Sequence, residues 1–157
     1  MRRIWMAEFL YLGLLVAQKY AGPMPPKPDV PFLVHGDTLV TTEVVEAKEE
    51  GKKDDITYVI AGAASSAKTP LASPRLLIQV GSLNPEQLNL YKLEEKNGRR
   101  EITFSRKKKG SARRPLRITA TKVGENLYRI EVTDSLENGE YSLSPEGSNQ
   151  VFCFQVY

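Results

Sequence analysis

The 157-residue chain is poor in the side chains that build most catalytic and metal centres, with one cysteine (Cys153), one histidine (His35) and one tryptophan (Trp5). A single histidine cannot supply a multi-histidine zinc site, and a single cysteine excludes any disulfide within the chain. The chain also lacks a C-x-x-C-H sequence for covalent haem and a glycine-rich phosphate loop. We therefore expect a protein that is not an enzyme and holds no cofactor or metal.

Cys153 and His35 are far apart in the sequence, so neither has an evident partner for nucleophilic or metal chemistry. In the last strand Phe152, Phe154 and Val156 share the predicted core face, which puts Cys153 on the opposite face, partly covered or under a loop. A small packed residue is the favoured interpretation, and an intermolecular disulfide is the alternative in an oxidising compartment. His35 is expected to be a hydrogen-bonded surface residue in a loop.

Residues 1–20, MRRIWMAEFLYLGLLVAQKY, start with two arginines, continue with a run that is apolar apart from Glu8 and Gly13, and become polar at Gln18. This order is typical of a secretory signal peptide that is cleaved before Gln18. Read as one helix rising about 1.5 Å per residue, the same stretch is slightly short of a bilayer core but spans it with local thinning. The segment is thus either removed or retained.

Three residues favour a retained anchor over residues 1–21. Trp5 suits one headgroup interface and Tyr20 the other, while Glu8 is awkward in a signal core and inside a membrane would face a partner helix. Glu8 is also shallow enough to reach the headgroups instead. We expect a single-pass anchor with Arg2 and Arg3 in the cytoplasm and the domain on the periplasmic side, and a secreted chain is the alternative.

Residues 22–31 hold five prolines and predict an extended polyproline II spacer. Residues 32–157 are long enough for one domain with its own core. Their apolar and polar side chains alternate with period two, as in 56–60, 76–80, 116–120 and 128–132. Turn signals separate these runs at Glu50-Gly51, Asn97-Gly98, Gly124-Glu125-Asn126, Asn138-Gly139 and Glu146-Gly147. The pattern predicts an all-β, antiparallel sandwich of eight or nine short strands.

The stretch LENGEYSL, with Leu136, Gly139, Tyr141 and Leu143, resembles the tyrosine corner of immunoglobulin-like sandwiches, in which a tyrosine near the start of a late strand bonds back to the preceding loop. The ending NGEYSLSPEGSNQVFCFQVY is similar to the C-terminal pattern of a loose group of uncharacterised bacterial exported domains. These resemblances imply an immunoglobulin-like, extracytoplasmic β domain. They imply no activity.

Positive charge is concentrated in residues 99–117, RREITFSRKKKGSARRPLR, where nine basic side chains and one glutamate give a local net charge of +8. The sequence predicts a cationic loop between strands that end near Ser105 and begin near Leu116. Such a loop either keeps the domain soluble or docks on an acidic partner, anionic headgroups or a polyanionic glycan. No aromatic side chains interleave the basic ones, so no nucleic acid is expected. The predicted docking residues are Arg106, Lys107, Lys108, Lys109, Arg113 and Arg114.

Two functions fit these observations. The first is a membrane-anchored, non-enzymatic accessory subunit whose outer domain docks on the protein subunits of a larger membrane complex. The alternative is a secreted or periplasmic module that binds a glycan or small ligand. The second is weakened because the only tryptophan lies in the leader and because Tyr58, Tyr128 and Tyr141 fit a core better than a sugar platform. Aromatic side chains exposed on the folded domain would favour it.

Overall fold

The computed structural model describes residues 20–105 and 114–157. The predicted anchor helix, with Trp5 and Glu8, and the basic residues 106–109 and Arg113 lie outside the described residues. The described part consists of strands and one short 3-10 helix, η1 (Pro85–Gln87), which confirms the all-β class. It contains no helix of the length and apolar character that a membrane span requires.

Thirteen strands are described rather than the predicted eight or nine, so the predicted strand number is wrong. Between residues 38 and 61, for example, the chain forms four strands in succession. The strands are β1 (Phe32–His35), β2 (Thr38–Thr41), β3 (Glu43–Glu46), β4 (Lys48–Lys52), β5 (Asp55–Ala61), β6 (Lys68–Thr69), β7 (Arg75–Gln79), β8 (Leu88–Lys96), β9 (Arg99–Ser105), β10 (Ile118–Gly124), β11 (Leu127–Val132), β12 (Gly139–Pro145) and β13 (Gln150–Val156).

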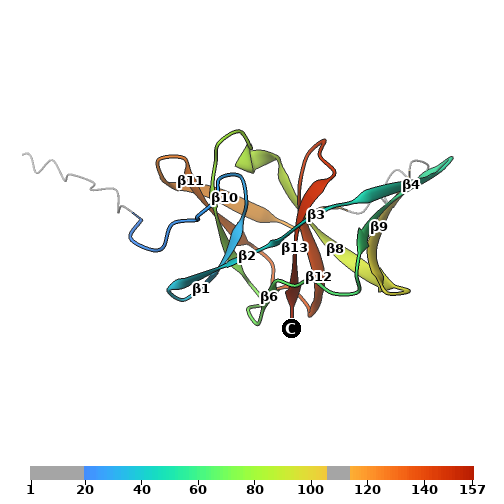
Figure 1. Cartoon of the computed structure of the whole chain (residues 1–157), viewed down its shortest axis with the longest axis horizontal. Coiled ribbons are helices and arrows are strands. Elements are labelled where there is room, and N and C mark those ends of the chain that lie inside the picture. The colour runs from blue at the N-terminus through green and yellow to red at the C-terminus, as the bar shows by residue number, and fades with distance from the viewer. Residues whose placement is uncertain (1–19, 106–113) are drawn as a thin grey trace, which may run out of the picture.

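The strands form two sheets. The small sheet has the order β10-β11-β7-β1-β2, and the large one has the order β3-β13-β12-β8-β9-β5-β4. The named strands pair antiparallel, except that β6 adds to β13 in parallel. Figure 1 shows β10 and β11 toward one end of the long axis and β4 and β9 at the other. The small sheet therefore covers only part of the large one.

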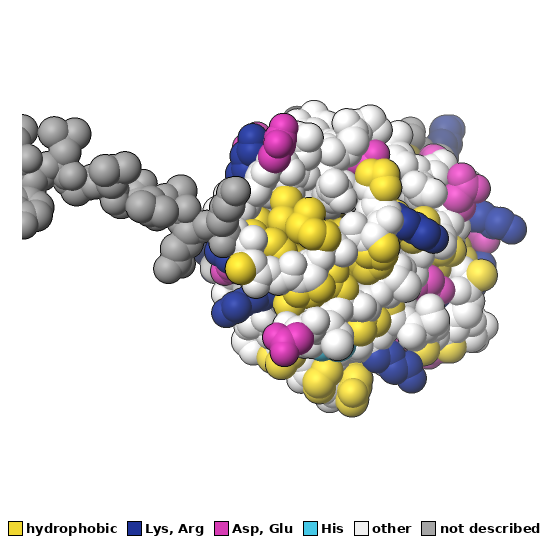
Figure 2. Space-filling view, turned by 60° about the vertical axis from the view of Figure 1, so that its left-hand side comes forward, with side chains coloured by type: hydrophobic (Ala, Val, Ile, Leu, Met, Phe, Trp, Pro, Cys, Tyr) yellow, Lys and Arg dark blue, Asp and Glu magenta, His cyan; other side chains and the backbone are white. Residues whose placement is uncertain are grey.

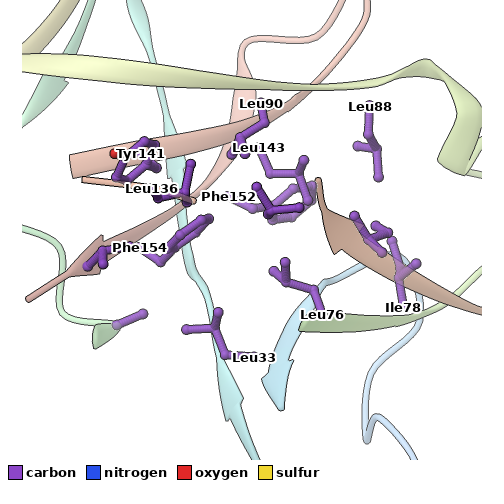
Figure 3. Packing of buried hydrophobic residues seen from close by; sticks show 14 residues of the cluster. Leu33, Leu76, Ile78, Leu88, Leu90, Leu136, Tyr141, Leu143, Phe152 and Phe154 are labelled. Atoms are coloured by element: carbon purple, nitrogen blue, oxygen red, sulfur yellow. The ribbon is translucent and has the colours of Figure 1, made fainter. Parts of the chain in front are cut away.

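The first core lies between the two sheets, as expected for a sandwich (Figure 3). Strands β12 and β13 turn every second side chain toward it, which is the period of a pleated strand. Its members are Leu33, Leu76, Ile78, Ile130 and Val132 of the small sheet, Leu88, Leu90, Tyr141, Leu143, Phe152, Phe154 and Val156 of the large sheet, and Ala67 and Leu136 of the loops.

The large sheet curls back on itself and encloses a second core. Strands β3 and β4 stand at opposite ends of its strand order, yet only Ala47 separates them in the chain. The covalent connection therefore joins the two ends of the sheet into a barrel-like curl. The second core inside this curl consists of Ala47, Ile60, Leu93, Ile102, Val151 and Cys153.

The second core corrects the prediction for Cys153, which is not on a partly covered outer face. Both faces of β13 are buried, because Phe152 and Phe154 contact the first core while Val151 and Cys153 contact the second. Only 1% of Cys153 is exposed, and burial raises the pKa of its thiol to about 12. The residue is therefore a packed, protonated thiol.

The tyrosine corner is present in this fold. The hydroxyl of Tyr141 donates a hydrogen bond of 2.7 Å to the carbonyl of Glu137 in the preceding loop. The ring is buried and stacks on Phe154, with centroids 5.7 Å apart. This bond fixes the loop that leads into β12.

Three of the five predicted turns are confirmed, and two are not. Asn97 and Gly98 join β8 to β9 with φ values of 53° and 76°, the conformation that favours asparagine and glycine in two-residue hairpins. The turns at 125–126 and 146–147 also lie where expected, whereas Asn138 and Gly139 mark the start of β12 and not a tight turn. The predicted turn at Glu50-Gly51 is wrong, because Gly51 pairs with Ile56 inside the β4–β5 ladder and residues 53–54 turn instead.

His35 does not lie in a loop, since it is the last residue of β1 and pairs with Thr38. Its carbonyl accepts a bond from the Thr38 hydroxyl. The ring is half-buried, and its Nε2 atom has no hydrogen-bond partner among the described residues. The predicted loop position of His35 is thus wrong.

Parts of the proline-rich linker, from Pro25 onward, lie against the domain. Pro25 is buried and Pro28 forms a bridge to Gln79. Asp29, with a φ of 60°, places its carboxylate against the backbone N–H groups of residues 81, 82 and 83 at 2.8–3.2 Å. A Cβ on Gly81 would stand 3.0 Å from that carboxylate, so glycine permits the close approach.

Candidate functional site

The β8–β9 hairpin opens a short distance from its turn. The two strands pair only where residues 94–96 meet residues 99–101. Beyond that point β8 pairs with β12 as far as Leu88, and β9 pairs with β5 as far as Ser105. The two halves of one hairpin thus belong to opposite walls of the curled sheet, and a cavity opens between them.

The cavity has a volume of about 640 Å³ and lies above the second core. Its apolar wall consists of Ala47, Ile56, Tyr58, Ile60, Tyr91, Leu93, Ile102, Phe104, Pro145 and Val151. Polar groups come from Glu49, Asn89, Ser142, Ser144 and the turn 146–149 between β12 and β13. An apolar interior with a polar rim is the usual composition of a small-molecule site.

Three aromatic rings form one side of this cavity. Phe104 meets Tyr91 and Tyr58 edge to face, with ring centroids 5.4 Å and 5.9 Å apart and interplanar angles of 83° and 76°. The arrangement follows from the pleat, because alternate residues of β5, β8 and β9 point into the curl. Edge-to-face pairs of this kind are attractive, so each ring supports its neighbour.

The three tyrosines that the sequence assigned to a core differ in their surroundings. Tyr141 is buried in the first core, and Tyr128 is half-buried against it. Tyr58 is half-buried and lines the cavity. The prediction is therefore right for Tyr141 and incomplete for Tyr58, whose ring faces a space that a ligand can enter.

The charged side chains at the cavity are acidic. Among the described residues that line it, Glu49 and Glu146 carry charge and no lysine or arginine does. Both glutamates are exposed at the rim. Burial raises the pKa of the neighbouring Tyr91, and the negative charge of Glu146 raises it further.

A buried ion pair closes the other end of the curl. Arg100 lies on the same side of β9 as Ile102 and Phe104 and is fully buried. Its guanidinium binds both carboxylate oxygens of Glu43, at 2.6 and 3.1 Å, and the carbonyls of residues 61 and 62. Glu140 lies 3.9 Å from it and accepts the N–H of Ser65, and burial raises the pKa of Glu140. The donors of the guanidinium are therefore bound to other groups of the protein.

The structure also places part of the cationic segment 99–117. Arg99 forms a bidentate pair with Glu50, Arg100 is the buried residue just described, and Arg117 pairs with Asp134. These three charges have partners inside the domain and do not belong to a free cationic surface. Of the six predicted docking residues, only Arg114 lies among the described residues, where it is exposed. Tyr20, predicted at a membrane interface, donates from its hydroxyl to the carbonyl of Pro23.

No set of three or more His, Cys, Asp or Glu side chains within 20–105 and 114–157 is arranged to hold a metal ion. No protein-family model matches the chain, and the comparisons with curated proteins and with solved structures find no match either. The site is therefore interpreted from its own chemistry.

Sequence reasoning missed the aromatic wall, although two signals for it are present. Tyr91 and Leu93 alternate with polar residues on one side of the Asn97-Gly98 turn, and Ile102 and Phe104 do so on the other. The uninterrupted apolar run 151–154 is typical of a strand covered on both faces, and it indicates a second core. Only the long-range pairing shows that these faces meet.

Proposed function

We propose that this domain is an extracytoplasmic binding module that takes a small ligand in the cavity between β8 and β9. The observation that carries the proposal is the aromatic and aliphatic cavity of about 640 Å³ at the opened hairpin. Ligand pockets typically measure roughly 300–1,000 Å³ and combine apolar walls with a few polar groups. The cavity has both properties.

The surrounding structure supports a preformed site. The cavity walls are strands of one continuous sheet, whose far end is held by the Arg100–Glu43 pair. Its floor is formed by second-core residues, among them Ile60, Ile102 and Val151. A rigid site binds without first ordering its own side chains, which lowers the entropic cost of association.

The location outside the cytoplasm is part of this proposal. It rests on the leader-like residues 1–20 and on the resemblance of the C-terminal pattern to bacterial exported domains. Kinship with immunoglobulin-like sandwiches belongs to the proposal as well, and the Tyr141–Glu137 bond supports it.

The proposal is tested by screening soluble small molecules for their effect on the thermal unfolding of the full-length chain. A ligand that binds only the folded state raises the unfolding temperature. Ser144→Phe fills the cavity from β12, and Thr121→Phe adds the same ring to an exposed position of β10 as a matched control. We expect stabilising molecules for the parent and for Thr121→Phe but not for Ser144→Phe. Equal stabilisation of all three proteins would refute the cavity as the site.

A membrane-anchored accessory subunit is a second proposal. Two observations favour it. The contacts of Asp29 fix where the linker joins the domain. Hydrophobic side chains also gather on the face of the domain next to the linker (Figure 2). Apolar surface of this kind suits contact with a partner subunit. The basic residues 106–109, 113 and 114 would add attraction to an acidic partner.

Membrane fractionation and intact mass distinguish the anchored from the cleaved chain. Full-length protein extracted only by detergent, together with co-purifying subunits, supports the anchored proposal. A soluble chain that starts near Gln18 refutes it. If the basic segment docks, replacing Lys107, Lys108 and Lys109 with serine weakens the association and reduces its dependence on salt. An unchanged salt dependence would show that these lysines do not take part in docking.

A further inference from the structure

We infer that the ligand of this cavity is an organic ammonium ion, with its alkylated nitrogen against the rings of Tyr58, Tyr91 and Phe104. The inference rests on the proposed binding function and adds the chemical class of the ligand. Three features of the described residues support it. These are the negative charges at the cavity, the aromatic wall, and the buried Arg100, whose hydrogen bonds go to other groups of the protein.

The first feature is charge. Glu49 lies on β4 and Glu146 in the turn after β12, so the two carboxylates reach the cavity from different elements. Neither forms an ion pair within residues 20–105 and 114–157. Unpaired charges of one sign around a concave, apolar site focus their potential into it. The cavity is therefore favourable to a cation and unfavourable to a carboxylate or phosphate.

The second feature is the aromatic wall. The faces of aromatic rings carry partial negative charge and attract a cation within about 6 Å of the ring centroid. Because Phe104 meets both tyrosines at steep angles, the three rings do not lie in one plane. A group in the cavity that lies against these rings meets aromatic surface in more than one orientation. Alkylated ammonium groups suit such a site, since they are more weakly hydrated than a metal ion and are apolar on their outside.

The third feature is Arg100. It is the basic residue on the inward face of β9, two positions before Ile102, and it would be the natural partner of an anionic ligand. However, it does not line the cavity, and its donors bind Glu43 and two backbone carbonyls. An anion in the cavity would thus have no buried cation to replace its lost hydration, which is costly in an apolar site.

The inference is tested with three probes of one shape and different charge. These are choline, its uncharged isostere 3,3-dimethylbutan-1-ol, and the carboxylate 3,3-dimethylbutanoate. Each is titrated into the full-length chain while the ring signals of tyrosine and phenylalanine are followed by NMR. We expect choline to bind about tenfold more tightly than the alcohol, the range that cation–ring attraction provides, and we expect the carboxylate to bind most weakly.

Two sets of variants separate the contributions. Tyr91→Leu and Phe104→Leu keep an apolar wall but remove a ring, so choline binding should weaken several-fold while alcohol binding changes little. Retained alcohol binding also reports that the variant is folded.

Glu146→Gln should weaken choline binding about threefold and alcohol binding not at all, because an exposed charge contributes modestly. Glu125→Gln, in the β10–β11 turn of the other sheet, is the matched control.

The outcomes separate the inference from the proposed function. Equal or tighter binding of the alcohol overturns the ammonium inference and leaves the cavity as a ligand site. Tighter binding of the carboxylate overturns it too. Binding of none of the three also overturns the inference, and the stability screen with Ser144→Phe then decides the proposed function separately.

Discussion

Tyr91 and Phe104 belong to the two strands of one hairpin, yet their strands have already separated where the rings meet edge to face at 5.4 Å. The backbone ladder ends at Glu94 and Glu101, and from there side chains rather than hydrogen bonds hold the two walls together. This is how a continuous sheet comes to contain a cavity.

The buried pair at the closed end of the curl should dominate the local stability. Arg100→Met leaves the carboxylate of Glu43 in a site from which water is largely excluded. We expect a loss of about 3–5 kcal/mol in the free energy of unfolding, measured by urea denaturation. Arg99→Met removes the neighbouring pair with Glu50, which is exposed, and should cost about 0–1 kcal/mol. Similar losses for the two variants would contradict the assigned role of Arg100.

The tyrosine corner should contribute one net hydrogen bond. Tyr141→Phe keeps the buried ring and removes only the bond to the carbonyl of Glu137. We expect about 1 kcal/mol of destabilisation by urea unfolding, because the carbonyl loses its partner. Tyr128→Phe serves as the control, since its hydroxyl has no hydrogen bond among the described residues. A loss no greater than that of the control would show that the corner is not formed.

The linker contact should depend on pH. Burial acts to raise the pKa of Asp29, but the bonds from residues 81, 83 and 82 outweigh it and hold the pKa below its ordinary value of 3.8. Since the folded state binds this proton less readily than the unfolded chain, the stabilisation is present above about pH 4 and is lost as the pH falls below that value. Asp29→Asn should therefore be less stable than the parent at pH 6, and the gap should narrow toward pH 3. A gap that does not change with pH would rule out this account.

The cysteine should be inert in the folded protein. Because Cys153 is buried and its pKa is raised to about 12, the thiolate that reacts with alkylating agents is scarce at pH 8. We expect no labelling by iodoacetamide until denaturant unfolds the chain, at which point labelling should be complete. Fast labelling of the native protein, or a disulfide-linked dimer that forms without unfolding, would contradict the packing of the second core.

The sequence predicts the local features of this fold well. The commonest two-residue hairpin turns favour residues that tolerate positive φ, so Asn97-Gly98 identifies its hairpin directly. The resemblance of LENGEYSL to the tyrosine corner predicts the bond from Tyr141 back to its loop. The turn predicted at Glu50-Gly51 from charged residues and a glycine is wrong. Gly51 lies inside the exposed strand β4, and the turn two residues later is made by lysine and aspartate.

The cavity could not be predicted in the same way, because it depends on pairing between distant segments. Period two shows that Ile102 and Phe104 share a face, but not that this face meets Tyr58 and Val151. That meeting follows from the single-residue connection at Ala47, which returns the end of the large sheet to its beginning. Once the curl is known, the buried Cys153 and the engaged Arg100 follow from it.

The most direct test of the account is chemical-shift mapping of the isotopically labelled protein during titration with a ligand found by the stability screen. The account predicts saturable shifts of Tyr58, Tyr91 and Phe104 and of the turn 146–149, and predicts that Ser144→Phe abolishes them while Thr121→Phe does not. Shifts that cluster on the small sheet, or that persist unchanged in Ser144→Phe, would show that the opened β8–β9 hairpin is not the binding site.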